Sequence, residues 1–315
     1  MNRKCLYCYG ELDSSDTSEY HHTCSQEFFG SPTPPSLNYS FAEMNELAKV
    51  IVSNHIAVPG VQPKLSLSVI DEVLNKVTRK RFTVVGALGG NYIFKPPSTY
   101  YPEMPENEHA TMKIAEAFGI NTVPSSLIRL NSGELAYITR RVDRHADGSK
   151  IHMLDMFQIT EAVDKYKSSM EKIGKALGLY SSETLFDQLR YFELTVFCFL
   201  TGNNDMHLKN FSMIHAGSKW VLSPAYDLLN VNLANPTDNE ELALTIEGKK
   251  RKLTKAHFER FGTQLQLNKK QIEGVFDRFI KKKSLAKSIL EKSFISLEGQ
   301  ERYWNIMESK YTLFE

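Results

Sequence analysis

Apolar and polar residues follow two different spacings along this chain of 315 residues. In the first half, apolar residues at every second position predict β-strands at 65–70, 81–87, 91–94, 125–130 and 134–139. In the second half, apolar residues recur at helical spacing and predict helices at 170–177, 184–200, 254–265 and 269–281. Two more helices, at 39–53 and 106–118, are predicted among the strands. The pattern predicts an α+β protein with a strand-rich first part and a mainly helical second part.

Two changes of composition indicate boundaries along the chain. Ser31–Ser36 is rich in proline and is typical of a linker. Around Arg140–Arg144 the strands give way to helices, so we place a hinge there. We therefore expect a small Cys- and His-containing module with its linker at 1–36, a small lobe at 37–140 and a helical large lobe at 141–315.

Composition places the chain among globular proteins. It is 42% hydrophobic with a net charge of +1, which supports a sizeable core and argues against binding nucleic acid by bulk charge alone. No apolar run approaches the ~20 residues of a membrane helix, and no apolar segment follows the charged start as in a secretory signal. Four cysteines in so long a chain do not suggest a disulfide scaffold. We expect a cytoplasmic protein that does not enter membranes.

The segment Gly202–Asn210 carries the strongest chemical signal in the chain. A kinase positions a hydroxyl group and neutralises charge on the transferred phosphoryl group, which requires a carboxylate base and oxygen ligands for magnesium. Protein kinases use Asp-x-x-x-x-Asn followed by a downstream Asp. Asp205 and Asn210 have this spacing, and Asp227 is available as the second carboxylate. Lys209 could place positive charge beside the transferred group.

An ordinary turn is the alternative for Gly202–Asn210, because Gly, Asn and Asp favour turns. The surroundings of the segment argue against it. A strand-rich part precedes the segment, helices surround it, and a short predicted hairpin leads from it to Asp227. This is the plan of a two-lobed protein-kinase-like fold, with a β-rich small lobe and a helical large lobe.

Two lysines of the first part could approach a nucleotide. Ile56–Lys64 is a loop with one glycine and two prolines, whose backbone N–H groups could lie near phosphates with Lys64 at its end. Lys95 ends a predicted strand, the position from which a kinase small lobe reaches the nucleotide. The alternatives are an ordinary loop that enters a hairpin and a solvated lysine at a strand end.

Glu108 lies in the first turn of the helix predicted at 106–118. It could pair with a lysine of the sheet, or it could complement the helix dipole. The local sequence favours the dipole role.

The amino-terminal module contains a candidate metal site. Cys5 and Cys8 form a Cys-x-x-Cys pair, and His21 and Cys24 follow in Tyr20–Cys24. Thiolates and imidazole are the ligands that zinc prefers, and His22 is an alternative fourth ligand. These residues could instead be small buried groups in a compact cap.

Two basic runs, Lys249–Lys252 and Lys281–Lys283, are typical of a solvated surface. Contact with a phosphate backbone inside a larger complex is the alternative.

Three motifs, in this order, resemble those of the HipA-like serine/threonine kinases, the toxins of bacterial toxin–antitoxin modules. The first, Gly60-Val61-Gln62-Pro63-Lys64, is similar to the family's phosphate-binding loop. The second, Tyr92–Pro96, is similar to its nucleotide-lysine strand. The third, Gly202–Asn210 with Pro224–Leu228, is similar to its catalytic and metal-binding loops. The short chain looks like the compact HipT-type toxins.

The resemblance implies an ATP- and magnesium-dependent protein kinase, and it implies a role for each matching residue. Asp205 would be the catalytic base, assisted by Lys209. Asn210 and Asp227 would bind magnesium. The residues that would contact the nucleotide are Gly60, Val61, Gln62, Lys64, Lys95, His207, Asn210 and Asp227, with Arg140 and Val142 at the adenine hinge.

The resemblance also implies partners. The family's known targets include aminoacyl-tRNA synthetases, so a protein substrate of that kind is expected. A HipB-like helix–turn–helix antitoxin would bind the kinase, together with a small third subunit in some systems, and DNA would be reached only through the antitoxin.

The chain departs from the family at two places. Family members often autophosphorylate a serine that precedes the loop glycine, but the matching positions here are Ala57 and Pro59. Either the chain lacks this control, or it modifies another residue such as Ser53 or Ser66, or Ala57 is an engineered substitution. Arginines also stand at the hinge where an acidic residue is expected, but hinge contacts are mostly made by backbone groups.

Three functions compete at this point. The first is an active kinase toxin, since Asp205, Asn210, Lys95 and Asp227 are all present. The second is a catalytically quiet kinase-like subunit that binds an antitoxin–DNA complex. The third is a small-molecule kinase on the same scaffold. Phosphate transfer to protein distinguishes the first from the other two.

Overall fold

A computed structural model describes residues 3–53, 64–74, 77–85, 89–145 and 147–315. The chain forms two compact units. The first consists of Met1–His109, Val123–Gly148 and Lys292–Phe294, and the second of Ala110–Thr122, Ser149–Glu291 and Ile295–Glu315. The expected boundaries at residues 36 and 140 stay a prediction.

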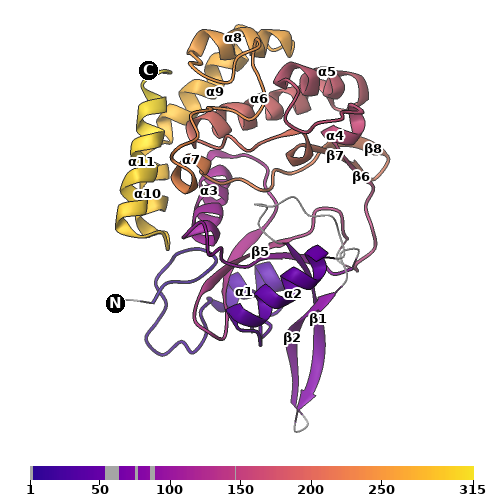
Figure 1. Ribbon diagram of the computed structural model, residues 1–315, viewed down its shortest axis with the longest axis vertical. Helices are drawn as coiled ribbons and strands as arrows, with labels where there is room; N and C mark the ends of the chain where they lie inside the picture. The colour runs from indigo at the N-terminus through magenta and orange to yellow at the C-terminus, as the bar shows by residue number, and fades with distance from the viewer. Residues whose placement is uncertain (1–2, 54–63, 75–76, 86–88, 146) are drawn as a thin grey trace. The chain divides into compact units, whose positions relative to one another are not determined.

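A five-stranded antiparallel sheet forms the centre of the first unit (Figure 1). Its order is β2-β1-β3-β5-β4. The strands are β1 (Leu65–Leu74), β2 (Val77–Val85), β3 (Tyr92–Lys95), β4 (Ser125–Arg129) and β5 (Leu135–Arg140). The strands predicted at 65–70, 91–94, 125–130 and 134–139 are present, and β1 continues to Leu74. The strand predicted at 81–87 begins earlier, at Val77, and β1 lies between it and β3, so 81–87 and 91–94 do not pair through a turn at Gly89–Gly90 as expected.

Helix α1 (His22–Phe29) joins the amino-terminal residues to this sheet. It ends at Gly30, whose positive φ of 72° lets its N–H reach the carbonyl of Gln26. Its last residues, Phe28 and Phe29, are buried and contact Tyr92 and Phe82 edge to face. The amino-terminal segment therefore shares its apolar core with the sheet. The first unit also contains α2 (Phe41–Ser53), as predicted, and the start of α3 (Met104–Phe118).

The second unit is mainly helical and is built around α6 (Thr184–Leu200). Every residue from Tyr191 to Leu200 is buried, which explains why this helix shows an almost continuous apolar run. The other helices are α4 (Met156–Ile159), α5 (Met170–Tyr180), α7 (Val231–Ala234), α8 (Lys255–Gln264), α9 (Lys269–Lys281), α10 (Lys283–Lys292) and α11 (Leu297–Tyr311). Aromatic contacts such as Phe192 with Phe276 and Phe199 with Phe258 fix α6 among them.

A small antiparallel sheet, ordered β6-β7-β8, lies in the same unit. The hairpin of β7 (Ser212–Ala216) and β8 (Lys219–Leu222) was predicted. The third strand, β6 (Met153–Asp155), was not, because three residues are too few for an alternation to show.

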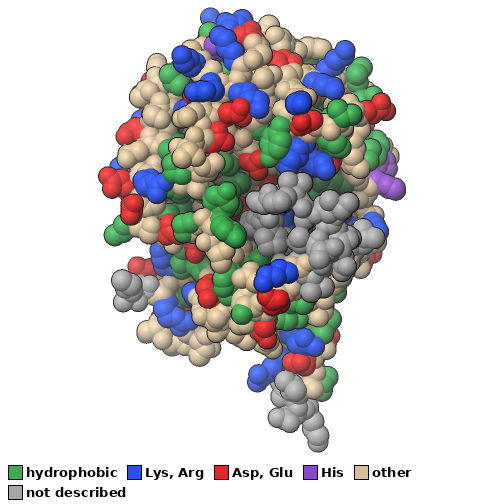
Figure 2. Space-filling view, in the orientation of Figure 1, with side chains coloured by type: hydrophobic (Ala, Val, Ile, Leu, Met, Phe, Trp, Pro, Cys, Tyr) green, Lys and Arg blue, Asp and Glu red, His purple; other side chains and the backbone are tan. Residues whose placement is uncertain are grey.

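Basic and acidic side chains are interspersed over the face shown in Figure 2. Within the described residues, no helix combines the length and the apolar character that crossing a membrane would require.

Candidate active site

The segment Thr201–Asn210 follows α6 and is held as a tight, mostly buried turn. Gly202 has a φ of 66°, and a Cβ at this position would lie 2.8 Å from the side-chain oxygen of Asn232 and 3.1 Å from that of Asn230. Only glycine fits this backbone without strain. The carbonyl of Gly202 accepts N–H groups of Val231 and Asn232, which anchors the turn to α7.

Asp205 and Asn210 meet within this turn. The side-chain amide of Asn210 donates to the carbonyl oxygen of Asp205 at 3.1 Å, and the N–H of His207 donates to the same carbonyl at 2.8 Å. With its NH₂ group engaged in this way, Asn210 presents an amide oxygen, an atom that magnesium binds. Both side chains are half-buried, so they are fixed by the turn and still reach solvent.

His207 supports the turn from inside. It is buried, and its Nδ1 accepts the N–H of Lys209 at the start of the 3₁₀ turn Leu208–Asn210. Burial lowers the pKa of His207 and outweighs the opposing effect of nearby Asp205, so the neutral imidazole is favoured. The geometry gives His207 a structural contact, and its expected contact with the nucleotide stays a prediction.

Tyr166 is a member of this site that the sequence did not reveal. Its hydroxyl donates to Oδ1 of Asp205 at 2.8 Å, and its ring lies edge-on to His207 with centroids 4.9 Å apart. The pKa of Tyr166 is raised by burial and by the charge of Asp205, so the phenol stays protonated and remains a donor. A chain hydroxyl thus occupies one oxygen of the carboxylate proposed as the base.

Tyr226 connects Asp227 to the same turn. Its hydroxyl hydrogen-bonds the carbonyl oxygen of Lys209 at 3.1 Å and also bonds the hydroxyl of Ser212 on β7. Asp227 follows in a left-handed conformation with φ of 58°, which is uncommon for residues other than glycine and is often found at functional sites. Tyr226 therefore fixes the position of the turn that carries Asp227. The sequence analysis did not identify it.

The ammonium group of Lys209 lies 4.8 Å from the ring centre of Phe157, and its side chain is exposed. This contact holds the lysine at the surface of the turn.

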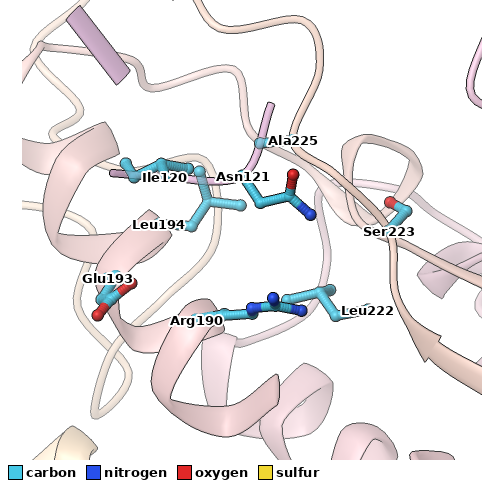
Figure 3. Close-up of a pocket in the computed structure, with 8 residues that line it drawn as sticks. All are labelled: Ile120, Asn121, Arg190, Glu193, Leu194, Leu222, Ser223 and Ala225. Carbon is cyan, nitrogen blue, oxygen red and sulfur yellow. The ribbon is translucent and has the colours of Figure 1, made fainter. Parts of the chain in front are cut away.

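A small cavity of about 20 Å³ lies beside the segment that leads to Asp227 (Figure 3). Ser223 and Ala225 line the cavity, together with Asn121, which follows α3, and Arg190 of α6. Its volume suits a water molecule and no substrate.

In the first unit, Lys95 and Glu108 form a buried ion pair. Lys95 ends β3 and Glu108 lies in the first turns of α3, and their charged atoms are 2.5 Å apart. Their side chains are 5% and 2% exposed, and the ring of Tyr137 lies under the ammonium group. The preference for a helix-dipole role of Glu108 was therefore wrong. The buried pair has the form of the lysine–glutamate pair of protein kinases.

Two arginine side chains of the predicted hinge, Arg140 and Arg141, form hydrogen bonds with α1 and β1. The guanidinium of Arg140 donates to the carbonyls of Phe28 at 2.8 Å and Glu27 at 2.6 Å, both in α1. Its side chain is thus directed at the amino-terminal module, and a nucleotide role for Arg140 or Val142 would fall to backbone groups. Ser66 on β1 is nearly buried and accepts a hydrogen bond from Arg141 at 3.2 Å.

Asp143 forms ion pairs with Arg141 and Arg144 of the same segment. Burial would raise its pKa, but hydrogen bonds and charge from Arg141 and then Arg144 outweigh burial and hold the pKa below its usual range. Arg141 binds both carboxylate oxygens at 2.8 Å.

Part of the predicted phosphate loop lies outside the residues that the structure describes. Gly60, Val61 and Gln62 lie outside the described residues, as do Ala57 and Pro59. Lys64 is described and is exposed at the start of β1. Lys95 belongs to the first unit, whereas Asp205, Asn210 and Asp227 belong to the second.

The four residues proposed as zinc ligands come together in the first unit. The ligand atoms of Cys5, Cys8, His21 and Cys24 all lie within 4.8 Å of one another. His22 is exposed and is not part of this cluster, so His21 is the histidine that the fold selects. A hydrogen bond with Cys8 lowers the pKa of Cys5 to about 4 and raises that of Cys8, so the thiols act as one coupled group.

Known proteins with similar sequences are kinases. Residues 56–286 match the family described as the HipA-like C-terminal domain. A putative kinase of Haemophilus influenzae is 29% identical over 270 residues, which are 76% of this chain and 76% of that protein. The serine/threonine-protein kinase toxin HipA of Shewanella oneidensis is 24% identical over 216 residues, 61% of this chain and 47% of that toxin. The chain also spans only 38% and 46% of two putative kinases of Sinorhizobium fredii.

Two solved structures resemble the fold. HipA of Shewanella oneidensis, in a complex with HipB and operator DNA, has a TM-score of 0.65 at 19% identity, over 81% of this chain and 64% of that one. The proinflammatory kinase CtkA of Helicobacter pylori has a TM-score of 0.53 at 14% identity, over 79% of this chain and 92% of that one. The predicted α+β, protein-kinase-like fold is confirmed.

Proposed function

The chain belongs to the HipA-like kinase family, and from this premise we propose that it is an ATP- and magnesium-dependent serine/threonine protein kinase. It acts in the cytoplasm as the toxin of a bacterial toxin–antitoxin system. The observation that carries the proposal is the turn in which Asn210 is bonded to Asp205, with Asp227 tied to the same turn through Tyr226.

In the second unit, four side chains carry out the reaction. Asp205 accepts the proton of the attacking hydroxyl through the carboxylate oxygen that Tyr166 does not occupy. The amide oxygen of Asn210 and the carboxylate of Asp227 would hold magnesium, and their oxygen chemistry suits this ion. Magnesium bound there would neutralise negative charge on the phosphates. Lys209, at the exposed edge of the turn, adds positive charge near the transferred group.

In the first unit, Lys95 binds the inner phosphates, and Glu108 keeps its ammonium group in place. Burial of both charges costs desolvation energy that a purely structural pair would not repay, which is consistent with a functional reason for the pair. Lys64 approaches the phosphates from the start of β1, and Gly60, Val61 and Gln62, which precede it in the sequence, contact the phosphates in the same proposal. Backbone groups near Arg140 and Val142 hold the adenine.

The proposed partners follow from the family. The HipA relative of known structure is bound to HipB and operator DNA, which supports a HipB-like antitoxin as a partner of this chain and contact with DNA only through it. A translation component such as an aminoacyl-tRNA synthetase is the proposed protein substrate. A small third subunit is part of the proposal because the chain resembles the compact members of the family.

The test is transfer of radiolabelled phosphate from ATP to the proteins of a bacterial lysate, with and without magnesium, followed by phosphoamino-acid analysis. A magnesium-dependent protein band that contains phosphoserine or phosphothreonine is expected. Nucleotide binding without any labelled protein would contradict the proposal. It would favour either the catalytically quiet subunit or a kinase with a small-molecule substrate.

A further inference from the structure

We propose that Cys5, Cys8, His21 and Cys24 form a structural zinc site that holds the amino-terminal module together. The site is separate from the proposed phosphoryl-transfer residues and does not depend on that function. Three thiols and one imidazole are a donor set of structural zinc sites.

The distances already match a tetrahedral ion. Nδ1 of His21 lies 3.4 Å from Sγ of Cys8 and 3.6 Å from Sγ of Cys24. Zinc bonded tetrahedrally at ~2.3 Å to sulfur and ~2.0 Å to nitrogen separates these atoms by about 3.5 Å. Both His21 distances therefore fit a tetrahedral ion, and all four ligand atoms lie within 4.8 Å of one another.

The neighbours of the cluster orient its ligands. Nε2 of His21 lies 3.0 Å from the carbonyl oxygen of Glu11, to which it can only donate, so the lone pair falls on Nδ1 and points at the thiols. The N–H of Gly10 donates to Sγ of Cys8 at 3.4 Å. A Cβ on Gly10 would lie 3.1 Å from the His21 ring and 3.3 Å from this sulfur, so the turn needs a residue without a side chain.

Each half of the site is a rigid local structure. The Cys5–Gly10 turn is closed by hydrogen bonds from the N–H of Cys5 to Gly10 and from the N–H of Tyr9 to Cys5. His21 precedes α1 and Cys24 lies in its first turn, so the start of this helix carries both ligands of the second half. The two halves approach each other at this cluster.

The alternative of small buried residues does not explain the cluster. Cys5 is fully buried, but Cys8 is exposed and Cys24 is half-buried, so two of the thiols are not core residues. Cys198, which is buried within α6, has the environment expected of a cysteine that serves only as an apolar group.

A hydrogen bond links the Cys5–Gly10 turn to the helix that carries Glu108. Tyr9 follows Cys8 and has an unusual φ of 64°, and its hydroxyl bonds Nδ1 of His109 at 2.8 Å in a buried position. His109 is the neighbour of Glu108 on α3. We infer that zinc fixes Tyr9 and thereby the first turns of α3, an effect that rests on the proposed nucleotide role of Lys95 and Glu108.

The test is metal analysis of the full chain, purified under reducing conditions without a metal-affinity tag. About one zinc per chain is expected. His21→Ala and Cys24→Ser should lose most of it, whereas the control His22→Ala should retain it. Replacement by cobalt(II) should give the intense visible absorption of a tetrahedral ion and a charge-transfer band from three thiolates.

His21→Cys tests the site even if His21→Ala and Cys24→Ser fail to fold, because it replaces one zinc ligand with another. It should keep the metal and change the cobalt spectrum to that of four thiolates. Folded wild-type chain with well under one zinc and no tetrahedral cobalt spectrum would overturn the site. Full metal content in His21→Ala would also overturn it.

Nucleotide binding tests the link to α3. A zinc-selective chelator that leaves magnesium bound should weaken the affinity for magnesium-ATP several-fold, and Tyr9→Phe should weaken it with the zinc still bound. Unchanged affinity in both samples would overturn the link and leave the zinc site standing. Failure of the zinc-loaded wild type to bind ATP would instead contradict the proposed kinase function.

Discussion

The Lys95–Glu108 pair of the first unit and the turn around Asp205 in the second unit are stabilised by different forces. In the first unit, Lys95 and Glu108 are removed from water, and each charge depends on the other. In the second unit, Asp205 is half-buried, and no ion pair is among the contacts described for it. Its backbone carbonyl accepts hydrogen bonds from the N–H of His207 and the amide of Asn210, and its carboxylate accepts one from the phenol of Tyr166. A change in the first pair should therefore damage the fold, whereas a change in Asp205 should damage the chemistry.

The largest effect on stability is expected for Glu108→Gln. It removes the carboxylate charge that lies 2.5 Å from the buried ammonium group of Lys95, and loss of one partner of such a pair costs about 3–5 kcal/mol. Denaturant unfolding measures it. The matched control is Glu116→Gln on the same helix, where Glu116 pairs with Lys113 near the surface, and there the change should stay below about 1 kcal/mol. Equal losses in the two variants would remove the contrast between buried and exposed pairs.

Asp227→Asn is expected to change magnesium dependence and leave the fold intact. The substitution keeps the size of the side chain and its tolerance of a positive φ, but it removes the charge. The magnesium concentration that half-saturates ATP binding should rise about tenfold or more. Asp277→Asn, at an exposed position of α9, is the control. A magnesium titration identical to wild type would exclude Asp227 as a ligand.

Tyr226→Phe should lower the free energy of unfolding by only about 1 kcal/mol, because it removes one hydroxyl that bonds Lys209 and Ser212. The phosphoryl-transfer rate should fall several-fold while ATP affinity changes little. Tyr180→Phe, at an exposed tyrosine, serves as the control. If the transfer rate of Tyr226→Phe matched that of the control, Tyr226 would have no role in positioning Asp227.

The smallest effect is expected for Tyr166→Phe. The acceptor hydroxyl uses the carboxylate oxygen that Tyr166 leaves open. Removal of the phenol makes the second oxygen available as well and should lower the KM for a protein acceptor by no more than a few-fold. The ring and its contact with His207 remain. A KM that rises would mean that the phenol orients Asp205 for the acceptor and does not compete with it.

Most strands and helices and the spacing of the catalytic motif could be predicted from local sequence patterns. Contacts between side chains that lie far apart along the chain could not. The strands around Lys95, the helix before Gly202 and the spacing of Asp205 and Asn210 are properties of short segments, and they could be predicted. Tyr166 lies 39 residues from Asp205 along the chain, and nothing in its own segment indicates their contact.

Long-range contacts also decide three other features that the sequence left open or predicted wrongly. The pairing of Glu108 with Lys95 and the direction of Arg140 toward α1 depend on tertiary packing, which local sequence does not specify. His21 and His22 are equivalent by composition, and only the start of α1 distinguishes them, since it turns one toward the thiols and the other to solvent.

The most direct test of the central claim compares purified wild type with Asp205→Gln in two measurements, the Kd of magnesium-ATP and the rate of phosphate transfer to protein. We expect an unchanged Kd and a transfer rate lower by about 10²–10⁴-fold, because only the base is lost. Wild-type transfer by the variant would contradict the assignment of Asp205 as the base. Loss of nucleotide binding together with transfer would contradict the division of the site into a charge pair that supports binding and a turn that performs the chemistry.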